Sequence, residues 1–368
     1  MSVQTLLLPA FRQFIHDSYS GKRLQKNGQP IRRQTVDNYV YVYKLLEEFE
    51  QHAAIELRIR SIAKMSKRQL NIEKNYWKKF YLRFVNFLHK EKNCYDNYVG
   101  NVIKIIRVFF NYLNKEKLIF TGDFFKSFYI KREEVPIITL QPAQLQFLIE
   151  DDAFGELLPA PLARTKDVFI FGCTVALRFC DLFNIRFRDI EQVNGSYYLF
   201  ARSQKTDVPT RVKLPAYAIA IVRKYQKRKS PASRVFPLVS MRQFNHNIRA
   251  IGERAGWTGE VGKSRNKNGV GKEMYKVNSR QAYRFCDLMT SHTMRRTAIT
   301  TMLMLGMPEH IVRKISGHAA NSASFHRYVN FVQSYLDSEI DKVHDKLLQR
   351  KSSPAMFGVM PNATTPSS

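Results

Sequence analysis

The sequence predicts a mainly α-helical fold with a small antiparallel β-sheet, arranged as an N-terminal helical bundle followed by a mixed α/β domain. Within the first 130 residues, apolar side chains recur at helical spacing in several segments. Residues 131–139 are polar and then extended, and Pro136 prevents a helix from continuing. Beyond this linker, helical and short strand segments are mixed. We therefore expect domains over 1–130 and 140–350, and a disordered Pro- and Ser-rich tail over 351–368.

In the N-terminal domain, a short helix is expected over residues 1–20, followed by a basic turn segment, GKRLQKNGQPIRR. A second helix begins at Thr35, and Ser66 with Gln69 forms the pattern of a capping box before a third. Aromatic side chains on the third helix could stack on nucleic-acid bases, but their helical spacing favours core packing. These residues are Trp77, Phe80, Tyr81, Phe84 and Phe87.

The second domain is expected to contain six helices, three strands and one mobile loop. The helices are expected near 141–151, 160–177, 215–229, 240–256, 293–305 and 309–316. The strands are expected at 185–190, 196–202 and 209–214. The Gly-, Asn- and Lys-rich stretch GKSRNKNGVGK, residues 262–272, is expected to be the mobile loop.

The composition indicates a polyanionic partner. Lys and Arg number 59 against 31 Asp and Glu, which gives a formal charge of +28. A protein tolerates the self-repulsion of such an excess when nucleic acid or an anionic membrane surface neutralises it. No stretch approaches the ~20 apolar residues of a membrane span. Nucleic acid is therefore the favoured partner, and no membrane association is expected.

The cysteines and the N-terminus indicate a reduced, cytoplasmic protein. None of the four cysteines forms a C-x-x-C pair, and a chain of this length does not need disulfides for stability. The opening, MSVQTLLLPAFRQF, lacks the basic region and the long apolar run of a signal peptide. We expect a cytoplasmic, nucleoid-associated protein.

Six residues of the second domain form an ordered motif. Each alone has an ordinary structural explanation, such as a surface Arg, a solvated Lys in a turn or a polar residue after a Gly helix cap. Residues 293–316 alone could also be the helix-turn-helix of a DNA-binding regulator. A regulator has no need of the whole series R…K…H-x-x-R…G-H…Y. The six residues are Arg178, Lys205, His292, Arg295, His318 and Tyr328.

This series resembles the tyrosine recombinase or phage integrase family. The surrounding sequence patterns T-x-x-L-R-x-x-D-L, S-H-x-x-R-R-T, I-S-G-H and R-Y are also similar to that family, over about Thr139 to Asp341. The N-terminal bundle resembles the SAM-like core-binding domain of these enzymes. The basic turn segment is similar to integrases of Bacteroidetes mobile elements. The resemblance implies a site-specific recombinase that cuts and rejoins DNA through a covalent phosphotyrosine and a Holliday junction.

The chemistry of phosphodiester cleavage independently fits two of these residues. Arg is the natural clamp for a phosphorane because its planar guanidinium meets two phosphate oxygens and keeps its charge. Arg178 and Arg295 are the expected clamp. No carboxylate cluster or Cys/His set is typical of a metal site, so we expect no metal and no cofactor.

The family resemblance implies the remaining roles. Lys205, at a hairpin tip, corresponds to the general acid for the 5′-oxygen. His292 corresponds to the His that assists proton transfer, and His318 to the residue that hydrogen-bonds a non-bridging oxygen. Asp181 corresponds to the acidic residue that supports this network. Tyr328 is the expected nucleophile, with Tyr335 as the alternative because the spacing from His318 is one residue longer than a common value.

One residue departs from the family pattern: Ser316 stands where Leu often precedes the G-H pair. Outside the motif, basic residues of the N-terminal domain are expected to contact the DNA backbone, although an ordinary solvated face could account for about half of them. The candidates are Lys22, Arg23, Lys26, Arg32, Arg33, Lys78, Lys79 and Lys104.

The expected partners are double-stranded recombination sites and further copies of the chain. The segment after Tyr328 keeps helical spacing of apolar residues up to Leu347. In the family such a helix docks on a neighbouring protomer, which implies a homotetramer on two sites; packing on its own domain is the equal alternative. A DNA-bending accessory protein is a further possible partner. Integration and excision of a mobile element is the expected use, with inversion, chromosome-dimer resolution and type IB topoisomerase-like relaxation as alternatives.

Overall fold

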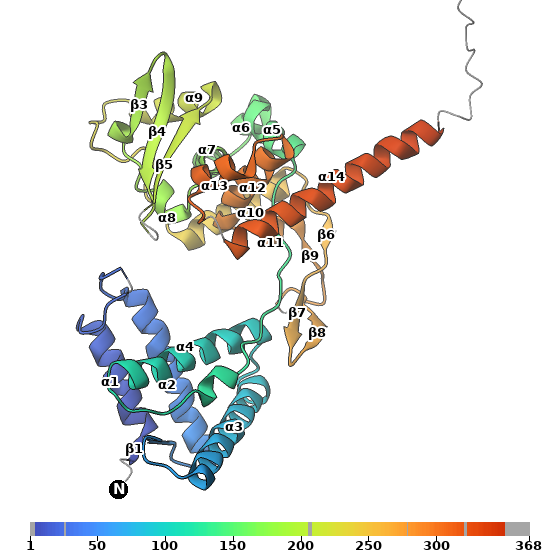
Figure 1. Ribbon diagram of the computed structural model, residues 1–368. Helices are drawn as coiled ribbons and strands as arrows, with labels where there is room; N and C mark the ends of the chain where they lie inside the picture. The colour runs from blue at the N-terminus through green and yellow to red at the C-terminus, as the bar shows by residue number, and fades with distance from the viewer. Residues whose placement is uncertain (1–3, 26, 205–207, 278, 320–321, 350–368) are drawn as a thin grey trace, which may run out of the picture. The chain divides into compact units, whose positions relative to one another are not determined.

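The computed structural model describes residues 4–25, 27–204, 208–277, 279–319 and 322–349 (Figure 1). The chain forms two units. Unit 1 comprises Met1–Val135 and Gly262–Gln281, and unit 2 comprises Pro136–Val261 and Ala282–Ser368. The chain therefore passes between the units three times. The first passage lies inside the linker that the sequence predicts. The expected disordered tail, 351–368, lies outside the described residues.

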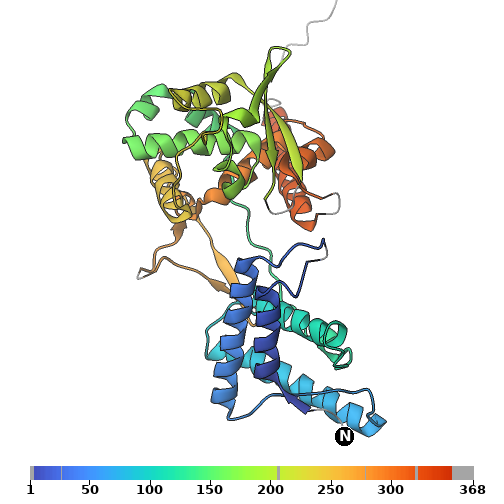
Figure 2. The ribbon, with the colours of Figure 1, turned by 90° about the vertical axis from the view of Figure 1, so that its left-hand side faces the viewer.

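Unit 1 is a helical bundle with a small strand pair at its start. Strands β1 and β2 pair antiparallel, with Thr5 opposite Ile59. Helices α1 and α2 lie side by side in both views (Figures 1 and 2). The elements are β1 (Gln4–Leu6), α1 (Leu7–Tyr19), α2 (Arg33–Ala53), β2 (Arg58–Arg60), α3 (Lys67–Lys90), α4 (Asp96–Lys115) and the 3-10 helix η1 (Phe124–Ser127).

The core of unit 1 is aromatic, as the helical spacing predicts. Trp77 is buried on α3, and its indole stacks on Phe124 with ring centroids 5.0 Å apart. The indole N–H donates to Glu73, which also pairs with Arg58 at 2.7 Å, so the buried carboxylate is neutralised. Ser66 caps α3 through the expected capping box with Gln69. The aromatic stripe of α3 is therefore a packing face.

Residues 262–272 form a hairpin, so the prediction of a mobile loop is wrong. Strands β7 (Ser264–Lys267) and β8 (Val270–Glu273) pair through a two-residue turn, Asn268-Gly269, in which both residues have positive φ. This turn sequence is the strongest short-range hairpin pattern, but the polar strands beside it lack the alternation that would reveal a buried face. The hairpin belongs to unit 1, although its sequence interrupts unit 2.

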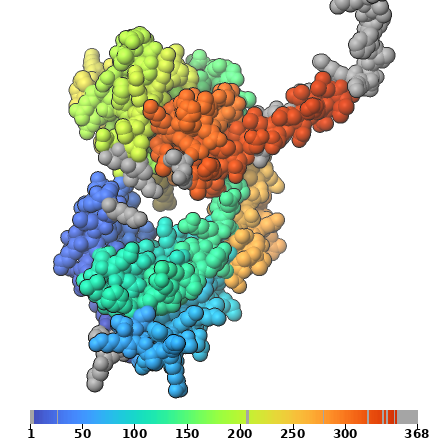
Figure 3. Space-filling model, viewed as in Figure 1, coloured from blue at the N-terminus to red at the C-terminus, as the bar shows by residue number. Residues whose placement is uncertain are grey.

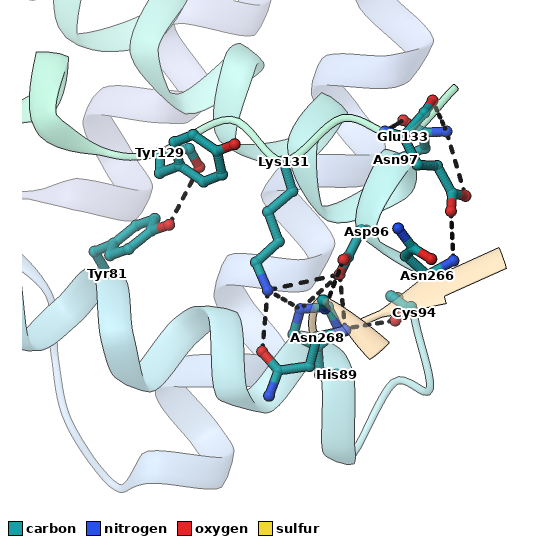
Figure 4. Close-up of polar contacts among 11 residues, drawn as sticks. Tyr81, His89, Cys94, Asp96, Asn97, Tyr129, Lys131, Glu133, Asn266 and Asn268 are labelled. Carbon is teal, nitrogen blue, oxygen red and sulfur yellow. Dashed lines mark hydrogen bonds and ion pairs between the residues drawn. The ribbon is translucent and has the colours of Figure 1, made fainter. Parts of the chain in front are cut away.

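Polar contacts fasten the hairpin to the N-terminal end of α4 (Figure 4). The buried Asp96 carboxylate accepts the backbone N–H groups of Asn268 and Gly269, each at 2.8 Å. Lys131 donates to the side chain of Asn268 at 3.0 Å and lies 3.6 Å from Asp96. The backbone N–H of Asn266 donates to Glu133. The hairpin is thus held by charge-assisted hydrogen bonds rather than by apolar burial.

Unit 2 combines helices with a small antiparallel sheet at one edge, ordered β3–β4–β5 (Figure 1). A second strand pair, β6 with β9, lies where the chain leaves for the hairpin and returns. The elements before the hairpin are α5 (Pro142–Glu150), α6 (Asp152–Glu156), α7 (Ala160–Val175), α8 (Phe179–Leu182), η2 (Phe187–Asp189), β3 (Ile190–Val193), β4 (Ser196–Arg202), β5 (Pro209–Leu214), α9 (Ala216–Gln226), α10 (Met241–Arg254) and β6 (Glu260–Val261). Those after it are β9 (Tyr283–Arg284), α11 (Phe285–Leu288), α12 (Ser291–Met304), α13 (Glu309–Ser316) and α14 (Ala323–Gln349).

The predicted mainly α fold with a small antiparallel sheet is confirmed, with one further correction. The strand expected at 185–190 is a 3-10 turn followed by a strand that starts at Ile190. The Asp189 carboxylate accepts the backbone N–H of Arg186 at 2.8 Å, and this local bond favours a turn over an extended chain. Among the described residues, no helix is long and apolar enough to span a membrane.

Candidate active site

Arg178 is placed by a sharp turn at the end of α7. Ala176 adopts a left-handed conformation, with φ of 55°, and ends the helix, so that Arg178 becomes the N-cap of α8. The Arg178 guanidinium donates to the Ser203 hydroxyl at 2.8 Å, just past the end of β4. Its side chain keeps a quarter of its surface exposed. Arg178 is thus oriented by the sheet while remaining accessible to a ligand.

Asp181 links the turn that carries Arg178 to the hairpin between β4 and β5. Its carboxylate is buried, accepts the backbone N–H of Gln204 at 2.9 Å and lies 3.9 Å from the Arg178 guanidinium. The other oxygen of Asp181 has no hydrogen-bond partner among the described residues. Lys205, the next residue after Gln204, lies outside the described residues. The supporting role expected for Asp181 stays a prediction.

Arg178 and Arg295 form a basic pair in this site, and Arg295 is its buried member. It is 5% exposed, and its guanidinium donates to two backbone carbonyls, those of Ala176 at 2.8 Å and Ser316 at 2.7 Å. Burial, and to a lesser extent the charge of Arg178, lowers the pKa of Arg295 to about 10. Arg295 therefore stays charged at neutral pH, and two like charges face one site.

His318 lies next to Arg295, directly after α13. Gly317, in the left-handed conformation, ends α13 and turns the chain so that the His318 ring lies beside the guanidinium. The Nδ1 atom is 2.8 Å from the Ser316 hydroxyl, and Arg295 Nη2 is 3.3 Å from Nε2. Burial, together with Arg295 and Arg178, lowers the pKa of His318 to about 4. The imidazole is neutral at physiological pH.

Tyr328 completes the cluster from α14. Its ring is partly buried, with its centroid 6.1 Å from that of His318, and it packs on an apolar group that includes Phe325 and Val312. Tyr328 is also close enough to Arg295 to influence the pKa of that residue. The alternative, Tyr335, lies seven residues further along α14, and its side chain lies outside the described residues. His292, one helical turn before Arg295, is exposed.

The structure thus brings together Arg178, Asp181, Arg295, His318 and Tyr328 in unit 2. The sequence did not reveal two hydroxyl partners, Ser203 and Ser316, because a single Ser has no distinctive pattern. The departure of Ser316 from the family pattern marked its position in the sequence but did not predict its contact with His318.

The basic residues expected to contact DNA are spread over unit 1. Lys22 and Arg23 follow α1, Arg32 and Arg33 lie at the start of α2, Lys78 and Lys79 lie on α3, and Lys104 lies on α4. Arg23 is largely committed within the fold, because it pairs with Glu116 at 3.2 Å and lies over the rings of Phe14 and Tyr112. The others are exposed, except that Lys26 lies outside the described residues.

A groove between α2 and α4 was missed in the sequence. Its volume is about 530 Å³, and polar, aromatic and aliphatic side chains line it. Tyr41 is half exposed there, and its ring meets that of Tyr98 edge-on at 5.9 Å. The polar lining residues Asn38, Asn101 and Lys104 lie on the solvent side of amphipathic helices, where sequence patterns carry little information. Asn and Lys side chains are suited to base edges and phosphates.

Comparison with known proteins relates the chain to a protein family and to several solved structures. Residues 156–333 match the model of the phage integrase family. The solved structures that resemble the chain include the XerH site-specific recombinase bound to a palindromic difH substrate, with 12% identity, a TM-score of 0.56, and 88% of this chain and 91% of that chain covered. A lambda integrase dimer bound to a COC′ core site gives 12%, 0.54, 88% and 95%. The Tn1549 transposon integrase with circular intermediate DNA gives 13%, 0.53, 88% and 95%.

At such low identity these structures show the fold alone. No curated protein matches the chain significantly. The family match runs from the end of α6 into the first part of α14, and so includes all six motif residues. Residues 156–333 therefore form a catalytic domain of the phage integrase family, the domain of a tyrosine-type recombinase.

Proposed function

We propose that this recombinase is a site-specific integrase that cleaves DNA through a 3′-phosphotyrosyl intermediate on Tyr328. The single observation that carries the proposal is the pairing of two guanidinium groups, Arg178 and Arg295, beside a neutral His318 and a tyrosine. Such a site is suited to a phosphodiester, because charge that develops on the phosphorane oxygens meets fixed cations and hydrogen-bond donors.

The proposed step is an exchange of one phosphate ester for another. The Tyr328 oxygen forms a bond to phosphorus, and the bond from phosphorus to the 5′-oxygen breaks. The tyrosine proton leaves through His292, and Lys205 donates a proton to the departing 5′-hydroxyl. Arg178 and Arg295 stabilise the phosphorane, with His318 as a further hydrogen-bonding group. The reverse step, with a 5′-hydroxyl from a partner strand, rejoins the DNA and leads through a Holliday junction.

We assign the DNA-binding role of unit 1 to the groove between α2 and α4 and to the exposed basic residues. The groove offers amide and phenol groups for base edges, and Lys104 beside them for phosphates. Lys22, Arg32, Arg33, Lys78 and Lys79 would add sequence-independent attraction. The same enzyme would act in the bacterial cytoplasm, where its DNA lies.

The C-terminal helix supports a proposed tetramer on two DNA sites. The first turns of α14 pack on their own unit through Phe325 and Val332, which are buried. The rest of the helix stands out from unit 2 (Figure 3). Apolar side chains along it are exposed, and a neighbouring protomer is the partner that would cover them. They are Leu336, Ile340, Val343, Leu347 and Leu348.

Within the family, mobile-element integration and excision is the role we propose, and a DNA-bending accessory protein is a proposed partner. The solved relatives include both a transposon integrase and XerH, so their fold does not choose between integration and other exchanges. The basic turn segment between α1 and α2 supports the integrase role through its resemblance to element-encoded enzymes.

The deciding experiment is capture of the covalent intermediate. Purified protein is mixed in EDTA with nicked duplexes tiled across the DNA that flanks its gene, and products are separated on a denaturing gel. We expect an adduct with the wild type and with Tyr335→Phe, and none with Tyr328→Phe. An adduct that persists in Tyr328→Phe and disappears in Tyr335→Phe would move the nucleophile. Absence of any adduct across all duplexes, with DNA binding intact, would refute the proposed chemistry.

A further inference from the structure

Ser316 contacts the surroundings of Arg295 and His318 through two of its groups, the backbone carbonyl and the side-chain hydroxyl. It is the last residue of α13 and is 1% exposed. Its backbone carbonyl accepts from Arg295 at 2.7 Å. Its hydroxyl lies 2.7 Å from the carbonyl of Val312, one turn earlier, and 2.8 Å from Nδ1 of His318. The hydroxyl therefore sits between a permanent acceptor and an imidazole nitrogen.

A hydroxyl is the one small side-chain group that complements both neutral forms of imidazole. It carries one proton to donate and two lone pairs to accept. When it donates to Val312, it accepts the proton of Nδ1–H. When it turns and donates to Nδ1, the ring proton lies on Nε2. Because burial and the neighbouring arginines keep His318 neutral, these two tautomers are the states that matter at physiological pH.

We propose that Ser316 is a positioning residue for His318, whose hydroxyl anchors the Nδ1 edge of the ring so that the Nε2 edge faces the phosphate held by Arg178 and Arg295. The inference rests on the proposed function, since it assigns His318 a contact to the scissile phosphate. With the hydroxyl turned to Nδ1, the Nε2–H group donates to a non-bridging oxygen. In the free enzyme, Arg295 Nη2 lies 3.3 Å from Nε2 and 3.4 Å from Nδ1, so the hydroxyl, at 2.8 Å, is the nearer neighbour of Nδ1.

The side chain and the backbone of Ser316 can be separated by mutation. Any residue at this position retains the carbonyl that holds Arg295, so Ser316→Ala removes only the hydroxyl. Leu, which the family often has here, would fill the space and remove the hydroxyl from Nδ1, leaving only Arg295 Nη2, at 3.4 Å, beside that nitrogen. Ser316→Thr keeps the hydroxyl. The three variants therefore isolate the hydrogen bond from the volume of the side chain.

Single-turnover cleavage of a nicked duplex, at saturating DNA, is the first measurement. Ser316→Ala and Ser316→Leu should cleave on the order of tenfold more slowly, as expected for one hydrogen bond that orients a catalytic group. Ser316→Thr should recover most of the rate. In a His318→Ala background, adding Ser316→Ala should change nothing further, because the hydroxyl then has no ring to orient.

Thr165 provides a matched control in the same unit. Its hydroxyl is also buried on a helix, donates to the carbonyl of Pro161 one turn earlier at 2.8 Å, and accepts from the Asn247 side chain at 2.9 Å. Thr165→Val removes an equivalent hydroxyl away from the basic pair. It should lower the melting temperature as Ser316→Ala does, while leaving the cleavage rate unchanged.

A second readout does not depend on activity. Nitrogen NMR shifts of His318, assigned by their loss in His318→Gln, report the tautomer directly, and Ser316→Ala should alter them while Thr165→Val should not. Equal slowing by Ser316→Ala in the presence and absence of His318 would overturn the inference, as would unchanged shifts. If the wild type forms no adduct, the proposed function fails, and the NMR comparison still decides whether Ser316 sets the ring.

Discussion

The backbone N–H of Gly269 donates a hydrogen bond of 2.8 Å to the carboxylate of Asp96, a residue 173 positions earlier in the chain. Asn268 donates to the other oxygen of the same carboxylate (Figure 4). A tight turn with both residues at positive φ presents two adjacent N–H groups, which suit an anion. The contact is buried, and His89 lies 3.4 Å from Asp96 on the other side. Together with Glu133 and Lys131, this carboxylate fastens the hairpin through polar contacts.

We expect Asp96→Asn to loosen the hairpin. The amide retains one acceptor oxygen but places an NH₂ group against the second N–H, which leaves a buried donor unsatisfied. Such a change costs about 1–3 kcal/mol. Hydrogen exchange at the amides of Asn268 and Gly269 should accelerate. Asp123→Asn, at an exposed carboxylate of the same unit, is the control. Unchanged protection in Asp96→Asn would show that other contacts hold the hairpin.

Gly100→Ala should destabilise unit 1, although alanine favours a helix. A Cβ at Gly100 would overlap the backbone carbonyl of Lys131, where the linker crosses α4, and a backbone atom cannot rotate away. The gain in helix propensity is about 1 kcal/mol, and the steric cost is larger, so we expect a net loss of about 1–2 kcal/mol. Urea unfolding measures it. Gly259→Ala, where a Cβ meets nothing within 4 Å, should have little effect.

Arg295→Lys should retain the charge and lose the activity. The guanidinium satisfies the carbonyls of Ala176 and Ser316 simultaneously, and a single ammonium cannot reproduce this planar geometry toward carbonyls and phosphate together. Single-turnover cleavage should fall by about 10²–10³-fold, with DNA affinity little changed. Arg254→Lys, at an exposed position, is the control. A cleavage rate near wild type would mean that Arg295 serves only packing.

His318 should make the free energy of unfolding depend on pH. Its pKa is lowered in the folded state from 6.5 to about 4, first by burial and then by Arg295 and Arg178. The unfolded chain therefore binds more protons between these values, so the stability from the neutral ring is complete above pH 6.5 and is lost as pH falls toward 4. Urea unfolding of His318→Gln across this range should give a shallower pH dependence than wild type. Parallel curves would contradict the assignment.

Lys104→Ala should weaken DNA binding and its salt dependence together. If Lys104 neutralises one phosphate, the slope of log affinity against log salt should become less steep by about 0.9. Fluorescence anisotropy at several salt concentrations measures the slope. Lys126→Ala, an exposed residue of η1 in the same unit that pairs with Asp123, should leave it unchanged. An unchanged slope in Lys104→Ala would remove the α4 surface from the proposed interface.

Local patterns predicted most of the fold. The aromatic spacing of α3 and the pair Ser66 and Gln69 act within a few residues, so periodicity and cap chemistry are sufficient to predict that helix. The prediction of a mobile loop at 262–272 was wrong for the opposite reason. Its ordering comes from Asp96 and Glu133, far away in the sequence, and its own strands are polar.

In the candidate site, too, local sequence motifs predicted some features, whereas contacts between distant residues could not be predicted. The H-x-x-R and G-H sequence motifs identified Arg295 and His318, and the structure places their side chains in contact. The roles of the six motif residues remain predictions. The buried carbonyl partners of Arg295 could not be predicted, because Ala176 and Ser316 meet it only through the packing of α7, α12 and α13.

The threefold passage of the chain between the units bears on synthesis. When residues 1–135 leave the ribosome, the hairpin that packs on the N-terminal end of α4 has not yet been synthesised. It follows only after residues 136–261 have been made. The first part of unit 2 in turn waits for α12 and α14, which follow the hairpin. Neither unit can complete its fold before the other is well advanced, so maturation is non-local and late. A fragment that ends before residue 281 leaves both units unfinished.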